Sequence, residues 1–85
     1  MTDKTAPEVL ADTGRALFDS EDWQSRLAKE LGVGRSTIQY WRNGKMPFGP
    51  DHPALDRLLG LVERRRAGLE KAEAELREWL RRNRG

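Results

Sequence analysis

The most restrictive feature of this sequence is a tight corner between two short apolar repeats in the segment Gln24–Lys45. The repeats meet at Leu31-Gly32-Val33, where the central glycine permits the positive φ that such a turn needs. The small residue Ala28, one turn earlier, lets a second helix approach closely. The segment therefore predicts two short helices packed at an angle, the second at about 35–43 and closed by Asn43-Gly44.

The residues before this corner predict a first helix at about 6–18. Thr5 and Glu8 form a capping box around its start, and Pro7 is tolerated in its first turn. The acidic stretch 19–22 is expected to cap the next helix, because acidic side chains stabilise the positive end of a helix dipole. Apolar residues at helical spacing give the inward-facing positions, which are Trp23, Leu27, Ala28, Leu31, Val33, Ile38 and Trp41.

The C-terminal part predicts a loop at 45–50 and then a long helical stretch, with Asp51 as cap and Pro53 in the first turn. An unbroken helix here would be about 50 Å long, whereas a domain of this size is only about 25–30 Å across. Either the helix breaks near Gly60 or Gly68 and folds back, or its end projects and pairs with another chain. Two heptad series run along it: Leu55, Val62, Leu69 and Leu76, and Leu58, Arg65, Ala72 and Trp79.

Composition excludes several classes of protein. The 85 residues include no cysteine, so disulfides, thiolate zinc sites and cysteine nucleophiles are excluded. The one histidine, His52, stands alone, so we expect a structural or solvated side chain rather than a metal ligand. We find no catalytic constellation and expect no enzyme, no cofactor and no small-molecule ligand. The chain has no strand signal, no membrane span and no signal-peptide layout, so we expect an all-α protein of the cytoplasm.

The net charge of +2 conceals an uneven distribution. Residues 1–22 are acidic, whereas residues 23–49 carry five basic side chains against the single acid Glu30. A local basic block matters more for binding a polyanion than the total charge does. The charge pattern therefore places a polyanion-binding surface on the two helices of the corner.

The segment Gln24–Lys45 resembles the helix-turn-helix of the lambda-repressor-like family, also called Cro-type or XRE-type. The resemblance covers about 22 residues. It implies a small all-α domain of four or five helices that binds double-stranded DNA sequence-specifically, usually as a homodimer on an inverted repeat and usually to repress transcription. A helix corner without DNA function is the structural alternative.

In this motif the second helix enters the major groove and its N-terminal residues read base edges. Arginine can bind guanine bidentately and glutamine can bind adenine. The expected base-reading residues are Arg35, Ser36, Thr37, Gln39 and Tyr40, although Tyr40 can instead contact the backbone or a neighbouring side chain. The residues expected to contact phosphate are Gln24, Ser25, Gly34, Arg42, Asn43 and Lys45. For Gln24 this role is what the resemblance implies, because it opens the first helix of the motif.

We expect a flexible N-terminus at 1–5, a DNA-binding core at 6–50 and a C-terminal helical segment at 51–85 that completes the core and ends in frayed residues. An apolar stripe near the end of the C-terminal segment must be buried, either within the domain or in a two-fold dimer. Such a dimer would place the two reading helices one DNA turn, about 34 Å, apart. Arg64–Arg66 are expected to be solvated and paired with Glu63 and Glu70, the alternative being that they contact the DNA backbone. The stripe consists of Leu69, Leu76, Trp79 and Leu80.

Two functions follow from these patterns. The first is a homodimeric autorepressor, bacterial or phage-encoded and associated with the nucleoid. It is similar to phage Cro-type repressors, antitoxin-like autoregulators and anti-CRISPR-associated regulators. The alternative is a helical adaptor whose C-terminal helix binds a partner protein.

Overall fold

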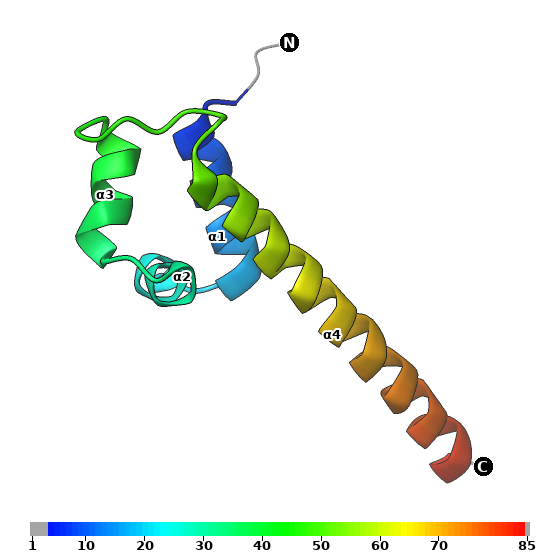
Figure 1. The fold of residues 1–85 in the computed structure, drawn as a ribbon. Helices are drawn as coiled ribbons and strands as arrows, with labels where there is room; N and C mark the ends of the chain where they lie inside the picture. The colour runs from blue at the N-terminus through cyan, green and yellow to red at the C-terminus, as the bar shows by residue number, and fades with distance from the viewer. Residues whose placement is uncertain (1–3, 85) are drawn as a thin grey trace.

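Four α-helices account for most of residues 4–84, the part of the chain that this computed structural model describes. They are α1 (Ala6–Phe18), α2 (Trp23–Leu31), α3 (Arg35–Asn43) and α4 (Pro53–Asn83). The first three helices and the start of α4 form a globular body, from which the rest of α4 projects (Figure 1). Residues 4–84 contain no strand, so the expected all-α class is confirmed, as are the predicted bounds of α1 and α3.

Local signals end and begin most of these helices as expected. Thr5 Oγ1 accepts a hydrogen bond from the Glu8 backbone N–H at 3.3 Å. Gly32 and Gly44 adopt positive φ values of 72° and 84° and end α2 and α3. These are conformations that glycine adopts without strain, so both turns depend on the residue type.

Two of the predicted caps are wrong. Asp22 precedes α2 but its side chain makes no capping hydrogen bond, and its own backbone N–H donates to Ser20 Oγ within the turn. His52, not Asp51, caps α4, since its Nδ1 accepts from the Ala54 N–H at 3.0 Å. In the second case, packing of the imidazole ring against neighbouring aromatic side chains holds it in the capping position.

The core lies where α1, α2, α3 and the first half of α4 meet. Leu10, Leu27 and Ile38 are fully buried at its centre. Trp23 and Trp41 are also buried, as expected from their spacing. The remaining hydrophobic core residues come from α1, α2 and α4 and are Ala11, Ala28, Leu31, Ala54, Leu58 and Leu61.

Helix α4 runs unbroken through Gly60 and Gly68 for 31 residues, a length of about 46 Å. Of the two arrangements expected from the sequence, the projecting helix is therefore the one observed, and the molecule extends 58 Å along its longest axis. Past Val62 the side chains of α4 are exposed except for Leu80, which is half-buried. Ion pairs one turn apart, such as Arg66–Glu70 and Arg77–Glu73, stabilise this part of the helix.

The ends of the chain are described in part. Residues 1–3 of the predicted flexible N-terminus and Gly85 lie outside the described residues. Lys4 forms a 2.7 Å ion pair with Asp12. At the other end α4 continues to Asn83, so the residues expected to be frayed are helical up to that position. No helix within 4–84 is both long and apolar enough to cross a membrane.

Candidate nucleic-acid interface

Helix α3 has one buried and one exposed face. Ile38 and Trp41 anchor it in the core. Arg35, Ser36 and Gln39 are exposed on the other side and line one shallow hollow of the surface. The structure thus brings three of the five expected base-reading residues together on one face.

The other two expected base-reading residues, Thr37 and Tyr40, are less available for contact with a base. Thr37 is half-buried close to the start of α3. Tyr40 is 39% exposed, and the Lys45 ammonium lies 5.4 Å from the centroid of its ring. Tyr40 therefore lies between the exposed face and the basic end of α3, where a phenol is suited to a sugar or phosphate contact.

The start of α3 has backbone donors that no side chain caps. Gly34 is its N-cap, and no side chain caps the helix there. The φ of Gly34 is −79°, so the backbone does not require glycine, and an added Cβ would make only ordinary contacts. The open first turn lets the backbone N–H groups reach an anion, which a helix N-terminus attracts.

Gln24 and Ser25 lie in the first turn of α2 and are both half-buried. The Gln24 Oε1 atom is buried and has no hydrogen-bond partner among the described residues. A buried acceptor without a partner costs free energy, so hydrogen bonding does not favour this position of the Gln24 amide. Gln24 is thus turned partly into the domain, unlike Arg35 and Gln39.

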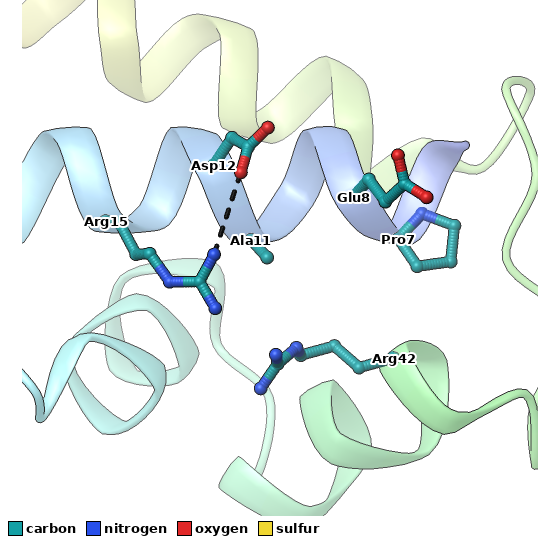
Figure 2. A pocket seen from close by; sticks show the side chains of 6 residues that line it. All are labelled: Pro7, Glu8, Ala11, Asp12, Arg15 and Arg42. Atoms are coloured by element: carbon teal, nitrogen blue, oxygen red, sulfur yellow. Dashed lines mark ion pairs between the residues drawn. The ribbon is translucent and has the colours of Figure 1, made fainter. Parts of the chain in front are cut away.

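Arg42 does not extend freely into solvent. Its guanidinium carbon lies 5.2 Å from the centroid of the Trp23 ring, and that of Arg15 lies 5.4 Å from it. Figure 2 shows both arginines, one from α3 and one from α1, reaching into a pocket of about 250 Å³. Arg15 is a basic residue that the sequence pattern did not indicate, because only the packing of α1 on α3 brings it to Arg42.

The two arginines differ in their ion pairing, because an acidic side chain on α1 binds Arg15. Asp12 pairs with Arg15 at 3.6 Å and with Lys4 at 2.7 Å. The hydrogen bond from Lys4 and its charge lower the pKa of Asp12, which keeps that carboxylate ionised beside Arg15. Within residues 4–84, Arg42 has no carboxylate at ion-pair distance, so Arg42 is the better placed of the two to pair with a phosphate.

The segment after α3 is anchored rather than loose. Asn43 Oδ1 accepts a hydrogen bond from the Lys45 backbone N–H at 3.0 Å, so this side chain is engaged in the turn. Phe48 stacks on Trp41 with centroids 4.9 Å apart, and His52 packs against both rings. The exposed Lys45 therefore lies in a short turn whose two ends are held in place, one by the end of α3 and the other by the packing of Phe48.

The residues expected at a dimer interface form an uncovered stripe. Leu69, Leu76 and Trp79 are 64%, 58% and 53% exposed, and Leu80 is half-buried. No described part of the chain packs over them, so the alternative in which the stripe is buried within one chain is wrong. Arg66 pairs with Glu70 as expected, whereas Arg65 donates to the Leu17 carbonyl oxygen at 3.1 Å.

Comparison with known proteins assigns no family to the chain. No protein-family model matches its sequence, and searches of curated proteins and of solved structures gave no match.

Proposed function

We propose that this chain is a transcriptional regulator that binds double-stranded DNA by placing α3 in the major groove. One observation carries the proposal: α3 has an exposed polar face and a buried face on opposite sides. Arg35, Ser36 and Gln39 form the exposed face, and Ile38 and Trp41 fix the buried face in the core. A helix of this kind, held by a tight corner against its neighbour, can enter the major groove without unfolding the domain.

The side chains on this face suit base recognition. Arginine can donate two hydrogen bonds to guanine O6 and N7, and glutamine can pair with adenine N6 and N7. Each such pair discriminates against a wrong base by about 1–3 kcal/mol. Arg35 and Gln39 are four residues apart on α3, which places them one helical turn apart and within reach of neighbouring base pairs.

Phosphate contacts flank the reading face in this proposal. The open N-terminus of α3 supplies backbone donors at one end, and Lys45 and Arg42 supply positive charge at the other. These groups contribute affinity for any sequence, and their contribution falls as salt concentration rises because counterions are released on binding.

The resemblance of Gln24–Lys45 to the lambda-repressor-like helix-turn-helix supports the same function, together with four helices in an order that suits it. In that function the chain acts as a homodimeric repressor at an inverted repeat. The exposed stripe on α4 is the surface available for pairing.

A selection from a random duplex library at about 0.15 M salt tests the proposal. We expect enrichment of a two-fold-symmetric site. The double variant Arg35→Ala/Gln39→Ala should lose the selected sequence but keep weak salt-sensitive binding, whereas the exposed control Lys29→Ala should select the wild-type site. Absence of any enriched sequence with the folded wild-type chain contradicts the proposal.

A second function, a helical adaptor, is favoured by one observation, the exposed Leu69, Leu76 and Trp79 on a projecting helix. Such a helix can bind the apolar groove of a partner protein. This alternative gains support if the chain shows no salt-sensitive DNA binding and Trp79→Ala abolishes association with a partner.

A further inference from the structure

Two arginines from different helices converge on one aromatic ring. The guanidinium carbons of Arg15 in α1 and Arg42 in α3 lie 5.4 Å and 5.2 Å from the centroid of the Trp23 ring. Figure 2 shows both side chains pointing into the same space between α1 and α3. Like charges gathered in one pocket repel each other, so this pocket favours a ligand of negative charge.

The chain compensates these positive charges only in part. Asp12 Oδ1 lies 3.6 Å from Arg15, but the other oxygen of the same carboxylate pairs with Lys4 at 2.7 Å. Glu8 also lines the pocket and forms no ion pair within residues 4–84. Arg42 has no carboxylate at ion-pair distance in the same part of the chain. Three basic groups thus stand against two acidic ones, and positive charge remains.

The hydrogen-bond donors of both guanidinium groups are free. Within residues 4–84 neither Arg15 nor Arg42 donates a hydrogen bond, and the contact of Arg15 with Asp12 is too long to be one. A guanidinium over an aromatic ring uses its flat face there and keeps the N–H groups at its edge available. The Trp23 ring is held in place, since it packs against α1 at Gly14 without room for a Cβ.

We propose that Arg15 and Arg42 together hold one phosphate group of the DNA backbone, with Asp12 competing for Arg15. Paired guanidinium groups suit the several oxygens of a phosphate, which each can bind with two N–H donors. The source of the phosphate rests on the proposed function. The inference extends the DNA contact to α1, which lies outside the helix-turn-helix segment Gln24–Lys45.

The position of Arg42 on α3 suits a contact at the edge of the groove. At about 100° per residue, Arg35, Gln39 and Arg42 fall within a sector of about 60° on one side of the helix. Arg42 is about 10 Å along the axis from Arg35, and the major groove is about 12 Å wide. When Arg35 reads a base, Arg42 therefore reaches the backbone that borders the groove, with Arg15 beside it.

Replacing Asp12 gives the sharpest test, because the proposal predicts a gain. Asp12→Asn should strengthen binding to every DNA sequence by about two- to fivefold, since it releases Arg15 from an exposed ion pair. In an Arg15→Gln background the same substitution should add much less. The control is Glu8→Gln, which removes an acid from the same pocket and should have equal effects in both backgrounds.

Salt dependence tests whether the two arginines share one phosphate. Arg15→Gln and Arg42→Gln should each lower the slope of log affinity against log salt by about 1, and the double variant should lower it no further. Separate phosphates would give a fall of about 2 in the double variant. Lys29→Gln, outside the pocket, should add its own effect to that of Arg15→Gln.

Inorganic phosphate tests the site without DNA. We expect the side-chain Nε–H resonances of Arg15 and Arg42 and the indole N–H resonance of Trp23 to shift in nitrogen-15 spectra when phosphate is added. Sodium chloride at the same ionic strength should not shift them, and Arg15→Gln should abolish the shift at Arg42. Far-ultraviolet circular dichroism checks that each variant keeps its helices.

The absence of these shifts, an equal gain from Asp12→Asn in both backgrounds, or additive losses in the double variant overturns the shared phosphate site. A selected DNA sequence would then still support the proposed function. Conversely, phosphate-induced shifts in a chain that selects no DNA sequence refute the regulator and the backbone as the source of the phosphate, but leave the anion site in place.

Discussion

Arg35 is the side chain on which the proposed base recognition depends most. Replacing Arg35 with alanine should cost about 1–3 kcal/mol in binding free energy at the selected site and relax one base position. The physical reason is the loss of a bidentate hydrogen bond from an exposed side chain that no described residue holds in an ion pair. Binding titrations on the selected site and on its single-base variants measure both effects, and an equal loss on every sequence would contradict the assignment.

Arg42 should behave differently from Arg35. Arg42→Ala should weaken binding to all DNA sequences similarly and reduce the slope of log affinity against log salt by about 1. Because the guanidinium also lies on the Trp23 ring, the variant should lose about 0.5–1 kcal/mol of stability. Arg42→Lys keeps the charge and serves as the control. A selective loss on one sequence would show that Arg42 reads bases.

His52 combines a helix cap with an aromatic contact, and two variants separate them. His52→Ala removes both the acceptor for the Ala54 N–H and the ring that packs on Trp41 and Phe48, so we expect a loss of about 1–2 kcal/mol in the free energy of unfolding. His52→Asn restores a capping oxygen and should recover part of that loss. Urea denaturation measures both, and equal stability of the two variants would show that the cap contributes nothing.

At the scale of elements, the contact between α1 and α2 depends on Gly14. A Cβ there would lie 2.7 Å from Cζ3 of Trp23 and closer still to Cε3, and both are ring atoms that cannot rotate away. Gly14→Ala should therefore destabilise the body by about 1–3 kcal/mol, the usual cost of overpacking a core.

Gly68 is the matched control for Gly14, since it also lies inside a helix but has nothing within 4 Å of an added Cβ. Gly68→Ala should stabilise α4 by about 0.5–1 kcal/mol, because alanine restricts the unfolded chain more than glycine does. Thermal unfolding of both variants measures the difference, and a stable Gly14→Ala chain would mean that Trp23 can repack.

At the scale of the whole molecule, the length of α4 governs the spacing of the reading helices. Helix α3 belongs to the body at the start of α4, whereas the exposed stripe lies on the projecting half of that helix (Figure 1). Half-sites separated by one DNA turn, ~34 Å, therefore require a dimer that brings the two bodies together and not only the two projecting ends. Shifting the half-sites of the selected site in single base-pair steps measures the optimum. We expect one turn, and an optimum at a larger separation would show that the two bodies lie apart on the DNA.

The sequence by itself determined the helices and their inward faces. Thr5, Gly32 and Gly44 mark helix ends because caps and positive-φ turns depend on the residue at that position and its nearest neighbours. Apolar spacing identified the buried positions, including Trp23 and Trp41, because a helix presents every third or fourth residue to the same side.

Only the tertiary structure decided the features that depend on contacts between distant segments. His52 caps α4 in place of Asp51 because Trp41 and Phe48 hold its ring. Arg42 lies on Trp23 because α1, α2 and α3 converge there. Helix α4 projects without a break because its two interior glycines weaken the helix but do not end it. Whether its C-terminal half folds back depends on a distant surface that could bury it, and local sequence patterns do not show such a surface.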